Sequence, residues 1–455
     1  MSSNSRFDAY ADLVVVGAGS AGCSAAMAAG LTGARRVLLV ERYGFLGGVS
    51  TQSLDTFYGF FTPGDAPKKA VGGVPDMVVD RLAARGDMFL RQNTYGAGTG
   101  VTYNPEYLKY LWDQLVSEAG VDVMHHTQVI DVDQPQGNDA TVLVVRSPGG
   151  VSRITARRVI DTTGDAVVSN LLGVELEQAG ESEAGQTFTT TFRMCNVDLE
   201  AFENAGGKKM LQATMANAVE SGRYALPRKK GSVHPMVHKN CIATVAVRVP
   251  FASPFDPHEI SRAEQEGRRQ VYIYEDFLRA EVPGFAEAKV IGMSTPQIGI
   301  RESRRLYGKY RLTREDCLSQ ARFDDAVMVC GAPIEDHRQN EDGQTETEWV
   351  YIPDGGVYQV PYRCFVAESH DQLWVAGRCF SATHSAHASC RSMGQTMSMG
   401  QAVGVAAGIS LERDCASSDV PIAELQQRLH RLGAVVAPPT RPAHTGAGDW
   451  TKNRH

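Results

Sequence analysis

The sequence predicts an α/β protein that combines a Rossmann-like domain with a second domain of mixed α+β structure. Two observations indicate this fold class. Near the N-terminus, an apolar strand, a glycine-rich turn and a helix of small residues follow one another over residues 12–29. After residue 165, short β-rich pieces alternate with helical ones up to about residue 365. The first pattern is typical of a βαβ unit, and the second indicates a separate mixed domain.

The first element is a buried strand over residues 12–16, which is followed by three glycines with G-x-G-x-x-G spacing. Gly17 allows the tight turn from strand to helix, and Gly19 has no side chain to keep a pyrophosphate away from the backbone. Gly22 lets the helix pack close to the strand. The N-terminus of that helix favours the charge of a phosphate. The motif therefore predicts a dinucleotide site.

The next strand, over residues 36–40, ends at Glu41. A carboxylate in this position accepts hydrogen bonds from both ribose hydroxyls and repels a 2′-phosphate. A glycine motif alone is weak evidence in a chain with 45 glycines, and a purely structural turn is the alternative. The strand before the glycines, the helix after them and the acid at this distance together favour the dinucleotide site.

Residues 1–165 form the predicted first segment of the nucleotide-binding domain, and several further elements complete it. A glycine turn after a proline favours a hairpin, and a proline is favoured in the first turn of a helix. The expected elements are a glycine-rich loop at 44–51, a helix over 104–119, two strands within 121–132, a hairpin of 140–146 with 151–155, and a strand from 158 that ends at a glycine turn.

Residues 166–365 are predicted to form the substrate domain, with β-rich pieces at 186–194 and 242–249 and helices over 199–221 and 257–280. The chain then returns to the nucleotide-binding domain in a second segment, residues 366–412, with a strand from Gln372 and a long helix of small residues over 391–411. Residues 413–455 contain a last helix over 420–432. The tail after Val436 is expected to be mobile or packed as an extended arm.

Composition excludes several classes of function. The chain has 455 residues, of which 43% are hydrophobic and 21% charged, as in a soluble globular protein. A net charge of −7 gives no general attraction to nucleic acid or to anionic lipid. The nine cysteines include no C-x-x-C pair, so neither a zinc site nor a redox dithiol is indicated. Scattered cysteines, no secretory signal and no membrane span predict a cytoplasmic protein.

Five segments carry a resemblance to a known family: residues 12–22 with Glu41, 47–51, 159–165, 298–313 and 373–408. In these segments the sequence resembles the FAD-dependent oxidoreductases with the glutathione-reductase-type, two-segment FAD fold. The first segment is shared by very many flavoproteins, whereas the last two are more specific to this branch. The resemblance implies FAD as the cofactor.

The resemblance also implies roles for individual residues. Pyrophosphate contacts would come from the first glycine turn, and the ribose contact from the acid that ends the second strand. The glycine-rich loop would approach the flavin, and the backbone of Val129 would meet the adenine. Gly377 and Arg378 would lie beside the ribityl-phosphate, where most wider relatives have Gly-Asp. The implied cofactor residues are Gly17, Gly19, Ser20, Ala21, Gly22, Glu41, Arg42, Gly47, Gly48, Ser50, Thr51, Val129, Gly164, Asp165, Gly377, Arg378, Met393 and Gly394.

Small residues at helical spacing over 391–404 would permit close approach to a planar cofactor. The N-terminus of this helix, aimed at the flavin, would stabilise the negative charge of the reduced ring. The alternative is a glycine-rich buried helix that touches no ligand. Aromatic residues at 57–61 are expected either to form a wall over the ring or to pack in the core.

The preferred reaction is that of a dehydrogenase or oxidase, in which a small organic substrate gives a hydride to flavin N5. An external acceptor, which is oxygen, a quinone or another protein, would then reoxidise the flavin. No second strand–glycine–helix unit and no C-x-x-C are visible, which argues against a disulfide reductase. A flavin-dependent monooxygenase is the first alternative. A non-redox lyase or isomerase, or a structural FAD, is the second. The sequence leaves both a monomer and a homo-oligomer open.

Four residues are candidates for catalysis. His384 and His387 precede the flavin-edge helix and are expected either to accept a proton or only to cap that helix. Arg391 can clamp a carboxylate, neutralise reduced flavin or face solvent. Arg301 is a candidate for substrate binding, whereas its neighbours Arg304 and Arg305 are expected to form ion pairs between domains. No third ligand accompanies the histidines, so no metal is expected.

Overall fold

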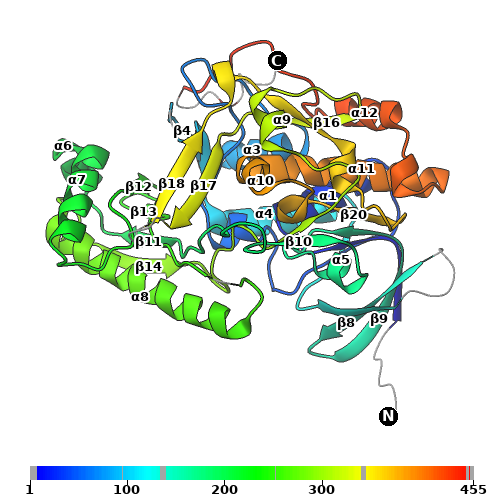
Figure 1. Ribbon diagram of the computed structural model, residues 1–455, viewed down its shortest axis with the longest axis horizontal. Helices are drawn as coiled ribbons and strands as arrows, with labels where there is room; N and C mark the ends of the chain where they lie inside the picture. The colour runs from blue at the N-terminus through cyan, green and yellow to red at the C-terminus, as the bar shows by residue number, and fades with distance from the viewer. Residues whose placement is uncertain are drawn as a thin grey trace.

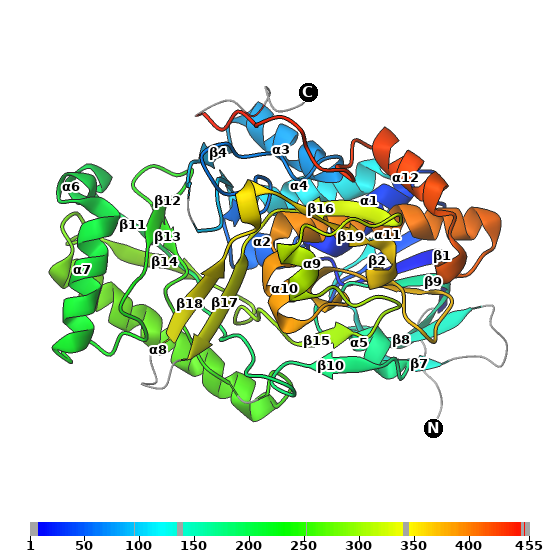
Figure 2. The same cartoon turned by 45° about the horizontal axis from the view of Figure 1, so that its top comes forward.

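The computed structural model describes residues 8–94, 96–133, 140–251, 253–339, 345–446 and 450, and these residues form two lobes side by side (Figures 1 and 2). One lobe contains the central sheet, together with the first and last described residues, Asp8 and Trp450. The other contains helices α6 (Leu199–Asn204), α7 (Gly207–Glu220) and α8 (Pro257–Glu281). A hairpin of β17 (Ile334–Gln339) and β18 (Thr345–Val350) lies between them in both views.

Five parallel strands form the main part of the central sheet, in the order β6 (Asp122–Met124), β2 (Val37–Val40), β1 (Asp8–Val16), β9 (Gly150–Asp161) and β20 (Leu373–Val375). The order reverses between β1 and β9. In a sheet of this kind, ligands bind outside the carboxyl ends of the strands at that reversal. This arrangement confirms the Rossmann-like fold, and the strand predicted after Gln372 does return to the same sheet.

Two antiparallel strands, β8 (Thr141–Ser147) and β7 (Gln128–Asp133), extend the sheet from the first half of β9. Both faces of β1 are buried. Leu13 and Val15 belong to one core cluster, and Val14 and Val16 belong to the cluster on the other side of the sheet. A strand buried on both faces needs a continuous apolar run, which is the pattern read from the sequence.

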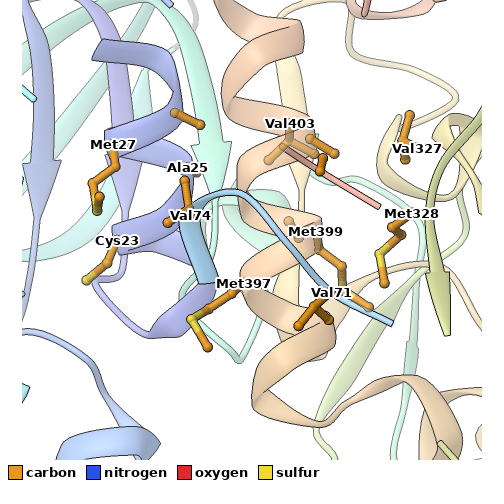
Figure 3. Close-up of a cluster of buried hydrophobic side chains, with 14 of the residues drawn as sticks. Cys23, Ala25, Met27, Val71, Val74, Val327, Met328, Met397, Met399 and Val403 are labelled. Atoms are coloured by element: carbon orange, nitrogen blue, oxygen red, sulfur yellow. The ribbon is translucent and has the colours of Figure 1, made fainter. Parts of the chain in front are cut away.

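Helices α1 (Ser20–Leu31) and α11 (Met393–Arg413) pack against each other through backbone contacts in the main core. A Cβ built on Gly400 would lie 2.1 Å from the Ala21 carbonyl oxygen, and one on Gly404 would lie 2.2 Å from the Ala25 carbonyl oxygen. Figure 3 shows side chains from both helices in this cluster. Gly400 and Gly404 therefore permit close contact between the two helices. The sequence pattern alone instead indicates that the small residues of this helix permit the approach of a planar cofactor.

Helices and strands of the first lobe surround this core. Asn104 caps α4 (Pro105–Glu118), since its side-chain oxygen accepts hydrogen bonds from the backbone N–H groups of Glu106 and Tyr107. The remaining elements are α2 (Val49–Gln52), β3 (Thr56–Phe57), α3 (Val74–Arg85), β4 (Met88–Arg91), β5 (Gly100–Tyr103), α4 (Pro105–Glu118), α5 (Val167–Leu171), β10 (Leu176–Gln178), β15 (Arg304–Leu306), α9 (Arg314–Leu318), β16 (Ala326–Cys330), β19 (Tyr358–Pro361), α10 (His384–Cys390) and α12 (Ile422–Arg431).

The second lobe has its own core, drawn from residues 188–298. This range is narrower than the predicted substrate domain of 166–365, because β16 and β19 contribute to the core of the first lobe. Its antiparallel sheet has the strand order β12 (Val233–Pro235), β13 (Ile242–Thr244), β11 (Phe192–Cys195) and β14 (Lys289–Met293). The strands are shorter than the apolar runs that predicted them.

Two helices differ from the sequence prediction. The helix expected over 199–221 is broken into α6 and α7 at Gly206 and Gly207, whose φ angles are +108° and +51°. The helix expected over 391–411 is preceded by the separate α10, and Arg391 lies in the junction between α10 and α11. Positive φ angles are available to glycine at little cost, which explains the first break.

The C-terminal tail is packed as an arm where the structure describes it. The Trp450 indole lies edge-on to Phe60 and Phe61, and its N–H donates to Asp80 at 2.9 Å. All nine cysteines are free. None of the helices in the described part of the chain combines the length and the apolarity needed to cross a bilayer. Over the same residues, no cluster of side chains has the composition of a metal site.

Candidate active site

The first glycine turn has room for a ligand at one position and none at the others. A Cβ built on Gly19 meets no heavy atom within 4 Å. One built on Gly17 would lie 2.6 Å from the Thr162 carbonyl oxygen, and one on Gly22 would lie 1.8 Å from the Gly17 carbonyl oxygen. Gly19 caps the N-terminus of α1, where backbone N–H groups favour an anion. The turn therefore fits the pyrophosphate of FAD, with Ser20 and Ala21 in the first helical turn.

The second glycine loop lies directly beside the first. Gly19 forms a parallel bridge with Gly47, and a Cβ on Gly48 would lie 2.9 Å from the Cα of Gly19. The Ser50 hydroxyl donates to the Gly47 carbonyl at 2.7 Å, and the Thr51 hydroxyl donates to the Leu46 carbonyl at 2.8 Å. The two hydroxyls stabilise the loop, so the residues expected to hold phosphate and flavin do lie together.

Glu41 is buried beneath the first turn. Its carboxylate accepts hydrogen bonds from the backbone N–H of Ala18 at 2.7 Å and of Tyr43 at 2.8 Å. An ionised carboxylate offers about four acceptor positions, so two are left for ribose hydroxyls. Arg42 lies 4.0 Å from Asp165 and donates to Gln297. Val129 is buried in β7 and pairs with Val145.

Arg378 joins three segments of the chain. Its guanidinium donates to the Gly164 carbonyl at 2.7 Å, to the Ile300 carbonyl at 2.6 Å and to the Asp165 carboxylate at 2.8 Å. Gly377, directly before it, packs against Ala21 of α1. The structure thus brings Gly164, Asp165, Gly377 and Arg378 together, with the donors of Arg378 engaged by protein groups. The expected contact of Arg378 with a phosphate stays a prediction.

His384 is held between two carboxylates. Its Nδ1 lies 2.9 Å from Glu302 and its Nε2 lies 3.2 Å from Asp336. Burial alone would raise the pKa of Asp336, but the hydrogen bond and charge of His384, together with Arg338, lower it. Both ring nitrogens are engaged by carboxylate oxygens in this arrangement, so His384 has no nitrogen left to accept a substrate proton.

His387 is fully buried and stacks on Phe380. Its Nε2 donates to the Arg378 carbonyl at 2.9 Å, and its Nδ1 has no partner among residues with a described position. Burial, followed by the charges of Arg305, Arg391 and His384, holds the pKa of His387 well below its usual value. His387 is therefore a neutral imidazole that anchors the junction before α11.

The arginines at 301–305 have different surroundings. Arg305 forms buried ion pairs with Glu177, at 2.7 Å, and with Glu302, but both acids lie within the predicted substrate domain and not across a domain boundary. Arg304 donates to the Asp165 carbonyl and lies over the Phe255 ring at 3.8 Å. Arg301 instead donates to the Thr187 carbonyl at 2.5 Å, and Arg391 donates to Gln186 at 2.9 Å. In the described part of the chain, neither of the two arginines chosen as substrate candidates forms an ion pair with a carboxylate, and Arg304 forms none either.

A buried histidine–aspartate pair, His234 with Asp55, was not found from the sequence. The two are 179 positions apart, and His234 Nε2 lies 2.9 Å from an Asp55 carboxylate oxygen. His234, Ala243 and Arg193 form one row across three strands, so the side chains of His234 and Arg193 share a face. Arg193 donates to the Leu54 carbonyl. Nothing local in the sequence marks such a pair.

The charges around Asp55 keep its carboxylate ionised. Burial alone would raise the pKa of Asp55, but the charge and hydrogen bond of His234, followed by the charges of Arg193 and Arg91, lower it. Tyr58 accepts a hydrogen bond from Arg91, and burial raises the pKa of its phenol. The pair therefore lies in a polar layer between the two lobes.

Tyr103 connects this pair with the second glycine loop and with α11. Its backbone N–H donates to the Asp55 carbonyl at 2.8 Å, and its hydroxyl donates to the Ser50 carbonyl at 2.7 Å. The same hydroxyl lies 3.9 Å from the Met393 sulfur. Gly394 packs on Tyr58 and Phe60. The residues predicted to surround the flavin are thus next to the histidine–aspartate pair. Phe57 stacks on Tyr103 at 4.0 Å and belongs to the core.

Comparisons with known proteins agree with this geometry. A family model described as FAD dependent oxidoreductase matches residues 12–429. A search of curated proteins finds no match. Among solved structures, the chain is similar to a p-nitrophenol 4-monooxygenase from Pseudomonas putida DLL-E4, with 11% identity, a TM-score of 0.45 and coverage of 90% of this chain and 83% of that one.

Two further solved structures have similar scores. Aklavinone-11 hydroxylase, in a complex with FAD and aklavinone, has 13% identity, a TM-score of 0.45 and coverage of 88% of this chain and 63% of that one. A flavoprotein/dehydrogenase from Cytophaga hutchinsonii has 12% identity, a TM-score of 0.43 and coverage of 92% and 83%. Similarity at this level assigns no reaction.

Proposed function

This chain belongs to the FAD dependent oxidoreductase family, and from that premise we propose that it is a dehydrogenase or oxidase acting on a small organic substrate. The two adjoining glycine loops would hold the FAD pyrophosphate, and Glu41 would bind the adenosine ribose. Met393 and Gly394 would lie at the flavin. When bound, FAD supplies a hydride acceptor at N5.

The observation that carries the proposal is the His234–Asp55 pair beside the predicted flavin residues. Oxidation of an alcohol or amine by hydride loss also requires a base for the departing proton. His234 directs Nε2 at Asp55, and no described residue forms a hydrogen bond with its Nδ1. Nδ1 is therefore the atom that accepts the proton, and Asp55 stabilises the resulting imidazolium. Tyr58, held by Arg91, orients a polar substrate group.

The test uses the visible spectrum of the purified holoenzyme, followed by anaerobic addition of candidate substrates. Bleaching of the flavin bands by one substrate alone supports the dehydrogenase or oxidase. We expect His234→Gln to keep the flavin spectrum and to slow this bleaching by about 10²- to 10⁴-fold, since a general base contributes that much. Turnover without any bleaching would contradict the proposal and would indicate a non-redox reaction.

A monooxygenase is the second candidate, because the same pair suits it. Hydroxylation of a phenol is assisted by removal of the phenolic proton, which is a step that His234 can perform in the same way. Two of the three solved structures named above are also oxygenating enzymes by name. The two candidates differ in their reductant. Bleaching only by a nicotinamide donor, with the organic substrate required for product formation, would favour the monooxygenase.

A further inference from the structure

Four buried or half-buried arginines gather between the lobes, and none of them forms an ion pair with a described carboxylate. They are Arg228, Arg248, Arg301 and Arg391. Arg248 and Arg301 are only 3% and 8% exposed. Within the ranges that the structure describes, no carboxylate oxygen lies within 4.0 Å of any of the four guanidinium groups. Buried charges in proteins are normally paired, so this cluster lacks an anion.

Three of the four side chains contact residues 186–189, and the charge of Arg228 acts on Arg248 and Arg301. Arg391 donates to the Gln186 side chain at 2.9 Å, and Arg301 donates to the Thr187 carbonyl at 2.5 Å. Arg248 lies 3.4 Å from the Thr189 hydroxyl and donates to the Val245 carbonyl at 2.6 Å. Arg228 has no hydrogen-bond partner among the residues described. Neutral oxygens thus orient the cluster but do not neutralise it.

The same region contains buried polar atoms that have no hydrogen-bond partner among the described residues. They are the amide nitrogen of Gln186, the hydroxyl of Thr187 and Nε of Arg391. Gln186 and Thr187 are 0% and 2% exposed. All three atoms can donate a hydrogen bond, and two of them can only donate. A site built of unpaired donors requires a ligand that offers acceptors.

Electrostatics agree with this assignment. Burial, followed by the charge of Arg391, lowers the pKa of Arg301 to about 9. Burial, followed by Arg301 and Arg228, holds the pKa of Arg248 well below its usual value. Burial and then the arginines likewise hold the pKa of His337 far below normal. Glu335 is the acid that opposes this charge, and it is engaged with His337 at 3.1 Å.

We propose that this arginine cluster binds the substrate, and that the substrate is a small organic acid with at least two carboxylates. The inference rests on the proposed function, because it names the substrate class of the same site. Arg391 is two positions from Met393, so the cluster adjoins the predicted flavin residues. FAD phosphates belong to the glycine loops, which leaves the cluster to another anion. Glu335 opposes one of the four positive charges, and a ligand with two carboxylates compensates two of the remaining three.

The first measurement is calorimetric titration of the oxidised holoenzyme with succinate and with citrate, in parallel with the uncharged analogue succinamide. We expect the carboxylates to bind and to raise the melting temperature, and succinamide to do neither. Inorganic phosphate is the third arm. Binding of phosphate as tightly as the carboxylates would overturn the assignment of a carboxylic acid, and so would equal binding of succinamide.

Two substitutions are expected to change carboxylate affinity in opposite directions. Arg228→Gln removes a cation and should weaken binding by about 10- to 100-fold, since a hydrogen bond to a charged group contributes that much. Glu335→Gln removes the opposing charge and should tighten binding. The matched control is Arg262→Gln on α8, whose side chain is 71% exposed, and it should leave the affinity unchanged.

Stability separates a binding site from a structural cluster. Removal of an unpaired buried cation relieves repulsion, so the ligand-free Arg228→Gln protein should melt at the same temperature as the wild type or higher. A lower melting temperature with unchanged carboxylate binding would overturn the inference. So would a shift of the flavin midpoint potential with unchanged binding, because the cluster would then serve reduced flavin.

The outcomes also separate this inference from the proposed function. Carboxylate binding that depends on Arg228, without anaerobic bleaching by any carboxylic acid, would support the cluster as an anion site and contradict dehydrogenation. Bleaching by an uncharged substrate, with no carboxylate binding, would support dehydrogenation and overturn the inference.

Discussion

Asp55 is a buried carboxylate whose charge is compensated by three cationic or imidazole groups from both lobes. Its pKa is lowered in the folded state, so the ionised form stabilises the fold. This contribution is present above the unfolded-state pKa of about 4 and is lost as the pH falls through the lower, folded-state value.

We therefore expect Asp55→Asn to cost about 3 kcal/mol of unfolding free energy at pH 7, since it leaves a buried pair broken. The difference from wild type should shrink below about pH 4. Denaturant unfolding between pH 3 and pH 7 measures this. A difference that stays constant over that range would show that the Asp55 charge contributes nothing.

His384 lies between two buried carboxylates, Glu302 and Asp336, and separates their negative charges. We expect His384→Gln to lower the unfolding free energy by roughly 3 kcal/mol, because Glu302 and Asp336 then repel each other. Anaerobic flavin reduction should slow by less than about tenfold, because no ring nitrogen is free for the proton. A stable variant with reduction slowed beyond about a hundredfold would restore His384 as the catalytic base.

At the scale of elements, the contact between α1 and α11 decides whether the glycine turn is held in place. Gly404→Ala puts a methyl group against the Ala25 carbonyl, at 2.2 Å, and both partners are backbone within rigid helices. We expect a loss of about 1–3 kcal/mol of unfolding free energy, with faster FAD release as α1 shifts.

Gly408 supplies the matched control on the same helix. The nearest atom to its added Cβ is 3.6 Å away, at the Thr32 side chain. Gly408→Ala should be neutral or stabilising by up to about 1 kcal/mol, because alanine is the better helix former. Equal stability losses in the two variants would show that close approach to α1 is not the cause.

At the scale of the whole molecule, Arg378 connects three parts of the chain. They are the end of the first segment, residue 300, and the second segment, in which the chain returns to the central sheet. Arg378→Lys keeps the charge, but a single ammonium on a flexible stem does not reproduce the planar fork that reaches three acceptors. We expect a loss of at least about 2 kcal/mol of unfolding free energy and weaker FAD retention. Arg413→Lys, in an exposed pair with Glu424, should cost less than about 1 kcal/mol.

The first lobe was predictable because its signals are local. Residues 12–41 contain the strand, turn, helix and acid in one run, and the structure has all four in place. The second lobe was less predictable. Its strands are shorter than the apolar runs in the sequence, and Gly206 and Gly207 interrupt a helix that the sequence periodicity predicts to be continuous. Tertiary contacts fixed these boundaries.

The candidate site divides in the same way. Arg301 and Arg391 lie in segments with recognisable spacing, so the sequence pointed to them. His234, Asp55 and the other two arginines come from separate elements, and only the packing of one lobe on the other brings them together. His234 and Asp55 are 179 positions apart, so no periodic pattern in the sequence predicts their contact.

The pairing of β20 with β9 has a consequence for how the protein is made. β9 ends at Asp161 and β20 begins at Leu373, so roughly 210 residues leave the ribosome between the two strands. At translation rates of about 5–20 residues per second, this interval lasts roughly 10–40 s. Throughout it, the last three residues of β9 lack their partner on one edge, and the face of α1 that α11 later covers is exposed. Molecular chaperones that bind apolar surface therefore have a defined window during synthesis in which to protect the nascent chain.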